Sequence, residues 1–519
     1  HRVTGMLRIG VDVGGTNTDA ALLRGSKVLA TIKTGTTADV TSGVAAAIRA
    51  VLLAAQVSPG DVSGVMIGTT HFLNAVVEGK RLERVGTLRL CGAATRSLPP
   101  MIDWPDRLRQ LVDGGAALVG GGVNFDGTPI APLDTAAIRA ACRTWRAQGV
   151  ASVAISAVFA QVDSRMEVQA AAIVAEEIPD VAVSLSHRIG RTGLLARESA
   201  TILNASLHRL GAETVGAFRA AFAGLGLTCP LYLTQNDGTL MSADFAERHP
   251  VFTIASGPTN SMRGAAFLTG LSDAVVVDVG GTTTDVGMLV AGFPRNRSEG
   301  AVIGGIPTNF RVPDVFSFGL GGGSLVLSGP PLAIGPASVG FRLPEKALCF
   351  GGDTLTATDI AVAAGLVTLG DPSRVRNLDA ALVKAALAKM KADLETVIDR
   401  MKPSADPVPA ILVGGGSVMI DGLLSGTSVS LRPDHFGSAN AIGAAIAQVS
   451  GEVDRVVALE GTTREKALEG LVAEARLRAV EAGANPNSLQ IAELEETPLS
   501  YLPGNAVRIA AKVVGDLAL

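Results

Sequence analysis

Two stretches of the chain repeat almost the same glycine turn between matching acidic and hydroxyl side chains. The first is VDVGGTNTD at residues 11–19, and the second is VDVGGTTTD at residues 277–285. Glycines accept positive φ, and such a turn can point successive backbone N–H groups into one anion-binding concavity. A hairpin needs only its turn glycine, so the repeated Asp and Thr favour a chemical role over ordinary hairpin closure.

An aspartate beside a phosphate-binding turn is a natural ligand for hydrated Mg²⁺, which prefers oxygen ligands. We therefore predict that Asp12 and Asp278 bind Mg²⁺, mainly through water, and that the two hairpins clamp a triphosphate from opposite sides. Asp19 and Asp285 end the motifs and would orient either a metal-bound water or the turn itself. The residues predicted to bind phosphates are Gly14, Gly15, Thr16, Asn17, Thr18, Gly280, Gly281, Thr282 and Thr283.

A third glycine cluster, ILVGGGSVMI at residues 411–420, lies between a predicted strand and a predicted helix. Backbone without side chains would let a flat nucleoside approach, although close packing of a helix on a sheet explains such glycines equally well. The chain has no GxxxxGK[ST] motif, so a P-loop is not an alternative phosphate site. The candidate nucleoside contacts are Gly414, Gly415, Gly416 and Ser417.

Three other segments carry candidate substrate contacts. GTTHFLN, residues 68–74, follows a predicted strand, and α/β proteins bind ligands at that end of their strands. Its histidine is a candidate acid–base group, with a structural role as the alternative. Glu198, Thr201 and Asn204 recur along one predicted helix, on either a cleft-facing or a solvated side. The loop GLGGGSLV, residues 319–326, is either a backbone anion site or a flexible loop. The residues concerned are Thr69, Thr70, His71, Asn74, Glu198, Asn204, Gly321 and Gly322.

Strands and helices alternate along the chain, which predicts an α/β fold. A strand–Gly-Gly-Thr–strand unit occurs once in each half, and a long helical stretch begins near residue 194. Gly- and Pro-rich loops are expected over 291–353, and one helix with two strands over the tail. The predicted domains are 6–190, 191–450 and a small C-terminal α/β segment, 451–519.

Composition excludes several classes of protein. Lys and Arg number 44 and Asp and Glu 48, a net charge of −4 without basic runs, so no nucleic-acid partner is expected. No uninterrupted apolar stretch reaches the length of a membrane span. The four cysteines are scattered and show no metal-ligand or disulfide spacing, which predicts reduced thiols in a cytoplasmic protein.

The motifs together resemble the hydantoinase A/5-oxoprolinase family. The matching stretches include GVDVGGTNTDAAL, GTTHFLNAVVEGK, ARESATILNASL, VVDVGGTTTDVGML and FSFGLGGGSLV, in the family's order over most of residues 7–447. The resemblance implies duplicated actin/hexokinase-like (RNase H-like) ATPase domains around a nucleotide cleft. It also implies ATP and Mg²⁺ as cofactors and ATP-dependent ring opening of a cyclic amide or imide, such as a hydantoin or a 5-oxoproline-like lactam. The carbonyl oxygen would be phosphorylated before water attacks, and a second hydrolytic subunit and an oligomeric state are implied.

The chain departs from the family pattern in two stretches that would border the substrate. TQNDGTLM has Asn236 and Asp237 where Asn-Gly-Gly is usual, and SGPTNS stands where SGPAGG is usual. The chain is also shorter than typical members. Alternative functions are a small-molecule kinase, an ATP-dependent carboxylase subunit similar to acetone carboxylase, and a regulatory ATPase. Regulatory activators in related folds carry iron–sulfur cysteines, and the scattered cysteines here do not match that pattern.

Overall fold

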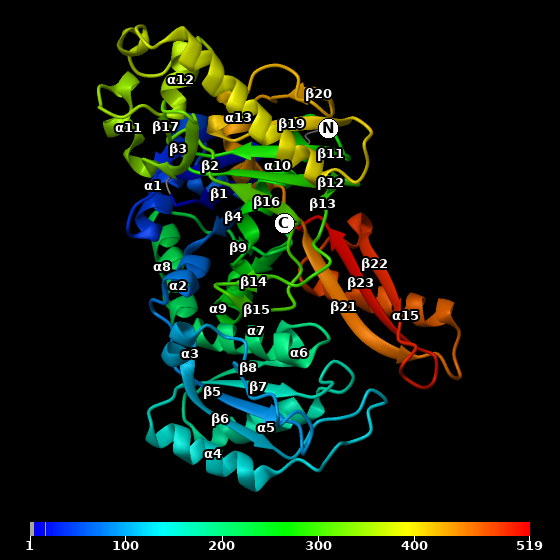
Figure 1. Ribbon diagram of the computed structural model, residues 1–519. Helices are drawn as coiled ribbons and strands as arrows, with labels where there is room; N and C mark the ends of the chain where they lie inside the picture. The colour runs from blue at the N-terminus through cyan, green and yellow to red at the C-terminus, as the bar shows by residue number, and fades with distance from the viewer. Residues whose placement is uncertain (1–4, 16) are drawn as a thin grey trace.

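The computed structural model describes residues 5–15 and 17–519, so Thr16 of the first glycine turn lies outside the described residues. The molecule is an α/β protein built on mixed and parallel sheets (Figure 1). The largest sheet has nine strands in the order β22-β23-β21-β10-β9-β4-β1-β2-β3. Its first hairpin is β1 and β2, which pair antiparallel, while β4 and β9 extend the sheet parallel to β1. These strands are β1 (Leu7–Val13), β2 (Asn17–Arg24), β3 (Lys27–Gly35), β4 (Gly64–Thr69) and β9 (Leu231–Thr234).

A second sheet repeats this arrangement. β11 pairs antiparallel with β12 and parallel with β19, and β20 follows parallel to β19. The second glycine turn therefore joins β11 to β12 as the first joins β1 to β2. The strands are β11 (Ala274–Val279), β12 (Thr284–Val290), β13 (Phe293–Pro294), β16 (Val315–Phe318), β19 (Val408–Val413) and β20 (Thr427–Leu431).

Helices cover both sheets and also separate them. On the outer face of the first sheet lie α1 (Val40–Ala55) and α8 (His208–Gly224), and on the outer face of the second lies α13 (Ala380–Met401). Between the sheets, α14 (Ala439–Ala445) packs on β1 and β2, and α10 (Ser256–Thr269) packs on β12 and β19. The two inner helices pack against each other, so the glycine turns of both sheets are held by one helix pair.

A four-stranded parallel sheet, β6-β5-β7-β8, forms a separate unit at the lower end of the molecule in Figure 1. One face packs on α4 and α5, and the other face contacts α7. The elements are β5 (Val85–Leu90), β6 (Asp113–Val119), β7 (Ser152–Ala157), β8 (Ala182–Leu185), α4 (Thr135–Ala147), α5 (Arg165–Glu177), α6 (Ser186–Ile189) and α7 (Leu194–Ser206).

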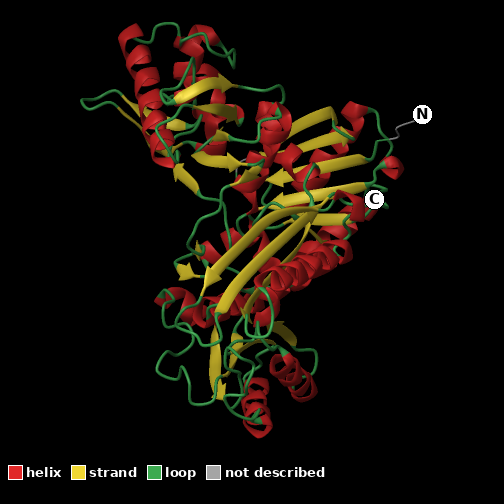
Figure 2. Cartoon of the chain, turned by 90° about the vertical axis from the view of Figure 1, so that its right-hand side faces the viewer, coloured by secondary structure: helices red, strands yellow, loops and turns green. Residues whose placement is uncertain are grey.

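The tail folds onto the body. β21, β22 and β23 join the nine-stranded sheet through β10, and α15 packs on β21 and β23. In Figure 2 these long strands cross the middle of the molecule. The tail has three strands where two were predicted. One of them, β21, begins before residue 451 and so crosses the predicted boundary. The elements are β10 (Leu240–Ser242), β21 (Val449–Ala458), α15 (Arg464–Glu481), β22 (Gln490–Pro498) and β23 (Ala506–Gly515).

Two local predictions differ from the structure. The helical stretch after residue 194 divides into α7 and α8 at Leu207, which caps both. The loops over 291–353 contain short strands and a short helix: β13 and β16 pair with β12 of the second sheet, whereas β14 and β15 pack against α2 and α7. The remaining elements are α2 (His71–Glu78), α3 (Asp106–Val112), α9 (Ala243–Arg248), α11 (Leu343–Lys346), α12 (Ala357–Ala363), β14 (Val302–Ile303), β15 (Ile306–Pro307), β17 (Ser324–Leu327) and β18 (Ala333–Ser338). Within the described residues, no helix combines the length and hydropathy that crossing a bilayer would require.

Candidate functional site

The described residues of the two glycine turns share the same cross-strand pairs and the same closing hydrogen bond. Asp12 lies opposite Asp19 across the first hairpin, and Asp278 lies opposite Asp285 across the second. In the first turn Gly14 N donates to Asn17 O at 2.9 Å, and in the second Gly280 N donates to Thr283 O at 2.9 Å. The repeated sequence is therefore closed by the same backbone hydrogen bond in both hairpins.

The turn glycines serve a different purpose from the one expected. None of the four has a positive φ, so the left-handed region is not the reason for glycine here. A Cβ on Gly15 or Gly281 would meet nothing within 4 Å, so both turns leave open space beside their backbone. The N–H groups of these two glycines donate to no described residue. Open space and free donors together suit an anion that approaches the backbone.

The threonines of the turns divide into two groups. Thr282 and Thr283 are exposed, whereas Thr18 and Thr284 are buried. Thr18 hydrogen-bonds to Thr36, and Thr284 donates to the Leu320 carbonyl at 2.6 Å. Among these threonines, only the exposed pair keeps hydroxyls available to a ligand, which removes Thr18 from the expected phosphate contacts.

Adjacent residues of α10 connect the two hairpins. Asn260 lies beside Asp12 and Ser261 beside Asp278, and each side chain opposes the rise in the pKa of its aspartate that burial causes. The negative charge of Asp278 also contributes to raising the pKa of Asp12, so the two carboxylates lie close enough to repel each other. Both hairpins therefore lie against the same pair of packed helices, as a two-sided clamp would require.

A second amide holds the first hairpin from α14. Asn440 Nδ2 lies 3.0 Å from Asp12 Oδ2 and 3.0 Å from Asp19 Oδ2, while Lys33 Nζ forms an ion pair with Asp19 at 2.6 Å. Asp19 therefore belongs to a fixed network beneath the turn. Sequence reasoning missed Lys33, Asn260, Ser261 and Asn440, although polar residues within SGPTNS and ANAIGAA were a visible signal.

The electrostatics of the paired aspartates fit a divalent cation. Burial, together with the charge of Asp19, raises the pKa of Asp12 to about 7, and burial raises the pKa of Asp278 to about 6. Burial also raises the pKa of Asp285, although a hydrogen bond from Ser317 partly offsets this rise. A bound cation would relieve this repulsion, because it favours the charged form of each carboxylate. Oxygen donors at two facing turns are the donor set that Mg²⁺ accepts.

The third glycine cluster packs directly against the second hairpin. Gly414 has φ +82°, and a Cβ there would lie 2.4 Å from Asp278 Oδ1, while one on Gly416 would lie 2.7 Å from the Gly280 carbonyl. Gly415 is exposed, and Ser417 is buried in a 3₁₀ helix, Gly415–Met419. The structure thus places the candidate nucleoside residues beside the candidate phosphate residues.

The loop at 319–326 also contacts the second hairpin, but it does not form an open anion site. Gly322 N donates to the Gly280 carbonyl and Gly323 N to the Gly281 carbonyl, and Gly321 N donates to Ser324 Oγ. These donors are used to support the turn. Gly321 and Gly322 are therefore supports of the candidate phosphate site, where sequence reasoning expected substrate contacts.

The segment after β4 lies beside the first hairpin, as its strand position predicted. Thr69 pairs with Val13 in the parallel register, and Thr70 Oγ1 lies 3.5 Å from the Val13 carbonyl. Thr69 is buried and accepts the His71 N–H, so it caps the local turn. His71 is half-buried, burial lowers its pKa, and Asn74 is exposed on α2.

The polar residues of α7 do not face a cleft. Glu198 is buried in a two-bond ion pair with Arg89, at 2.7 and 2.6 Å. The Thr201 hydroxyl donates to the Arg197 carbonyl, and the Asn204 amide donates to Ser184 and to the Arg248 carbonyl. Their spacing indicates a buried polar face that joins α7 to the four-stranded unit, so they are structural residues.

The loop after β9 connects the first hairpin to the tail. Asn236 is buried, and its side chain accepts the Ala255 N–H at 2.8 Å, which places the start of α10. Asp237 forms an ion pair with Lys512 of β23 and accepts the Thr239 N–H. Both residues border a large cavity that is separate from the glycine turns.

Two family models match most of the chain. The family model described as hydantoinase/oxoprolinase N-terminal region matches residues 8–178, and the hydantoinase/oxoprolinase model matches residues 197–453. The chain belongs to the hydantoinase/oxoprolinase family.

Two relatives of this hydantoinase/oxoprolinase chain, and two solved structures of other proteins that resemble it, are informative. It is 29% identical over 392 residues to caprolactamase subunit alpha of Pseudomonas jessenii, covering 70% of this chain and 55% of that one. It is 27% identical over 257 residues to the acetophenone carboxylase gamma subunit of Aromatoleum aromaticum, covering 47% and 35%. The chain thus spans about half the length of the first relative and about a third of the second.

The solved structures show the same fold over nearly the whole chain. The ATP-dependent caprolactamase from Pseudomonas jessenii superposes with a TM-score of 0.75 at 21% identity, covering 98% of this chain and 88% of that one. A nucleotide-free acetone carboxylase superposes with a TM-score of 0.68 at 18% identity, covering 99% and 88%. The fold of this family member is therefore shared with enzymes named for ATP-dependent chemistry.

Proposed function

We propose that this chain is an ATP-dependent ring-opening hydrolase, or the ATPase subunit of one, that acts on a cyclic amide or imide. The observation that carries the proposal is a pair of matching glycine turns held against the packed helices α10 and α14, with Asp12 buried before one turn and Asp278 half-buried before the other. Family membership and the similarity to a caprolactamase subunit support the reaction class. The common strand order of the two sheets supports duplicated actin-like halves around a nucleotide cleft.

Different groups of the chain would bind the Mg²⁺, the phosphates and the nucleoside of ATP. Asp12 and Asp278 would hold Mg²⁺, and the open N–H groups of Gly15 and Gly281 would bind phosphate oxygens. Gly414 and Gly415 would lie beside the nucleoside. ATP would supply the phosphoryl group that converts the amide carbonyl oxygen into a leaving group. Positioning and electrostatic stabilisation are the main demands of phosphoryl transfer, and rigid turns on sheet strands meet them.

The aspartates provide the direct test. Asp12→Asn and Asp278→Asn should each reduce Mg·ATP turnover by roughly 100-fold or more, because each removes a carboxylate that would hold the Mg²⁺ that neutralises the phosphate charge. Asp399→Asn, an exposed change on α13, is the matched control and should leave turnover intact. Circular dichroism should show all three variants folded. Normal turnover in both site variants would refute the clamp.

The substrate class needs a second measurement. ADP release should rise when hydantoins, 5-oxoproline or other cyclic amides are added, with and without a co-purifying subunit. If none of them stimulates ADP release, the ring-opening proposal fails.

A carboxylase subunit is the second candidate, because the acetone carboxylase structure superposes over 99% of this chain. Both reactions would pass through a phosphorylated intermediate. They would differ only in the molecule that reacts with this intermediate in the next step. Bicarbonate-dependent ATP consumption with a ketone, and no response to cyclic amides, would favour the carboxylase.

A further inference from the structure

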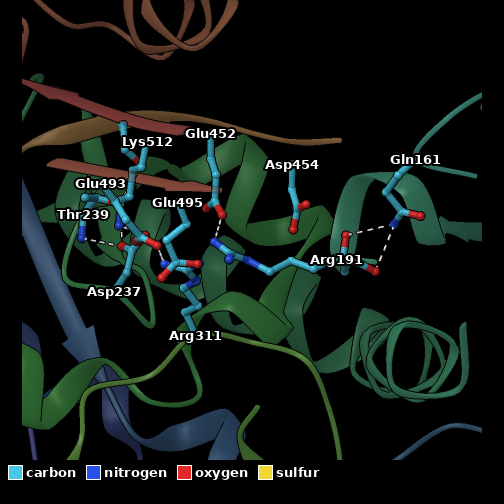
Figure 3. A network of polar contacts seen from close by, with 12 residues as sticks. Gln161, Arg191, Asp237, Thr239, Arg311, Glu452, Asp454, Glu493, Glu495 and Lys512 are labelled. Atoms are coloured by element: carbon cyan, nitrogen blue, oxygen red, sulfur yellow. Dashed lines mark hydrogen bonds and ion pairs between the residues drawn. The ribbon is translucent and has the colours of Figure 1, made fainter. Parts of the chain in front are cut away.

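Ion pairs join the tail to the body around a cavity of about 970 Å³ (Figure 3). In the pairs of two arginines the body supplies the cation, whereas in the pair of a lysine the tail supplies it. The pairs are Arg191 with Glu452, Arg311 with Glu493 and Glu495, and Lys512 with Asp237. Lys512, on β23, is therefore a tail residue that holds the loop after β9.

The pair of Lys512 and Asp237 is largely withdrawn from solvent, since the two side chains are 11% and 18% exposed. Although burial opposes it, the charge of Lys512 and its hydrogen bond lower the pKa of Asp237, so this carboxylate is ionised at neutral pH. Its second oxygen, Oδ1, accepts the Thr239 N–H at 2.9 Å and the Thr239 hydroxyl at 2.6 Å. Removal of the ammonium would leave a mostly buried negative charge without a partner, which is costly.

The loop that carries Asp237 is bonded to the start of α10. Asn236 Oδ1 accepts the N–H of Ala255, the N-cap residue of α10, at 2.8 Å. The Thr259 hydroxyl donates to the Asn236 carbonyl at 3.1 Å. Gly238 lies so close to the helix that a Cβ there would be 2.3 Å from Thr259 Cγ2. A shift of this loop would therefore move the start of α10.

The next residues of α10 reach the candidate nucleotide site. Asn260 Nδ2 donates to Oγ1 of Thr234, which ends β9, at 3.2 Å. Asn260 lies beside Asp12, and Ser261 lies beside Asp278. A continuous series of direct contacts therefore leads from the tail, through the loop after β9 and α10, to the aspartates of both hairpins.

We propose that Lys512 is a positioning residue for the nucleotide site: through Asp237 it fixes the loop that places α10 beside Asp12 and Asp278. The inference rests on the proposed function, because it gives the tail a role at that same site. Asp237 stands where the family pattern has glycine, so that pattern does not supply this ion pair. Loss of the pair leaves every proposed nucleotide ligand in the chain but loosens the helix that places the two aspartates.

Binding of Mg·ADP to the full chain, measured by isothermal titration calorimetry, tests the pair. Lys512→Gln and Asp237→Asn each remove one charge, and each should raise the dissociation constant roughly 2- to 30-fold, the range for residues that act on a site through others. The double variant should be weakened about as much as either single variant, because the two residues act as a unit. Lys512→Arg keeps the charge and should bind Mg·ADP as the wild type does.

Hydrogen exchange of the nucleotide-free chain locates the effect. In Lys512→Gln the amides at the start of α10, including that of Ala255, should exchange faster than in the wild type, because their hydrogen bonds open more often. Arg464→Gln is the matched control: it breaks the ion pair of Arg464 with Glu496, which lies within the tail between α15 and β22. This control should change neither the exchange of α10 nor the affinity for Mg·ADP.

Three outcomes would overturn the inference: unchanged Mg·ADP affinity in Lys512→Gln, unchanged exchange at the start of α10, or equal effects in Arg464→Gln. The double variant has no unpaired charge, so it keeps the test open if a single variant fails to fold. Wild-type binding of Mg·ADP with unchanged variants would defeat this inference and leave the ATPase proposal intact. Absence of Mg·ADP binding in the wild-type chain would defeat the two proposals together.

Discussion

At the scale of single residues, buried polar side chains divide into structural and candidate functional groups according to their partners. Glu198 receives two hydrogen bonds from the Arg89 guanidinium, whereas Asp12 receives the Asn440 amide and forms no ion pair with any described residue. A buried carboxylate with a full cationic partner has no capacity left for a ligand. A buried carboxylate without a cationic partner is stabilised when it binds a cation.

The Arg89–Glu198 pair gives the first prediction. Glu198→Gln should lower the free energy of unfolding by about 3–5 kcal/mol, because it leaves the Arg89 charge buried without a counter-charge. Chemical denaturation measures this loss. ATP turnover per folded molecule should not change, and a changed KM for the organic substrate would instead support the cleft-facing role that the sequence suggested.

His249 gives a prediction about acid stability. Burial among Phe245 and Phe252 lowers the pKa of His249 to about 4, from 6.5 in the unfolded chain. The unfolded chain therefore takes up the proton first, and stability falls as pH drops from about 6.5 to 4, by on the order of 3 kcal/mol. In His249→Gln, denaturation across this interval should show a flatter pH slope than in the wild type. The same experiment on His208→Gln controls for the loss of a half-buried histidine, and an unchanged slope for His249→Gln would contradict the assignment.

At the scale of elements, the crossing of α10 and α14 decides how the two hairpins meet. A Cβ on Gly264 would lie 1.8 Å from the Ala439 carbonyl oxygen, and one on Gly443 would lie 1.8 Å from the Asn260 carbonyl oxygen. Only glycine permits this approach. The helices therefore carry Asn260, Ser261 and Asn440 to both hairpins at once.

Substitution at this crossing tests the arrangement. Gly264→Ala should destabilise the protein by about 1–3 kcal/mol or more through overpacking, and should weaken Mg·ATP binding because α10 must shift away from both aspartates. Gly257→Ala lies in the same helix, where a Cβ would meet nothing within 4 Å. This control should be neutral or stabilise by less than ~1 kcal/mol. Equal effects of the two changes on nucleotide binding would show that the crossing of α10 and α14 does not position the nucleotide site.

At the scale of the whole molecule, the four-stranded unit has its own hydrophobic core, while the two larger sheets share the inner helices. The chain's two tryptophans, Trp104 and Trp145, are both buried. Trp145 lies in the core of the four-stranded unit, so its fluorescence reports on that unit alone.

Thermal unfolding of a Trp104→Phe variant should show whether the four-stranded unit unfolds separately from the two larger sheets. Mg·ATP should raise the transition seen by circular dichroism, because ligand binding stabilises the part that binds it. The Trp145 fluorescence transition should move less. Coincident transitions that shift together would show instead that the chain unfolds as one cooperative unit.

The sequence by itself determined the chemistry-bearing hairpins, the α/β class and the family, because these depend on local patterns. Repeated Asp, Gly and Thr residues within nine positions define a turn without reference to the rest of the chain. The strand before residues 69–74 also followed from the sequence, whereas its pairing beside β1 came from the structure.

Only the tertiary structure decided which polar residues meet. Glu198 and Asn204 look like cleft residues on a helix, but Arg89, which lies 109 positions from Glu198, neutralises the carboxylate. Asn260 and Asn440 lie in polar stretches that are visible in the sequence, but only the glycine crossing brings them to the same aspartate. Side-chain partners depend on contacts between segments far apart in the chain, and no local pattern encodes those contacts.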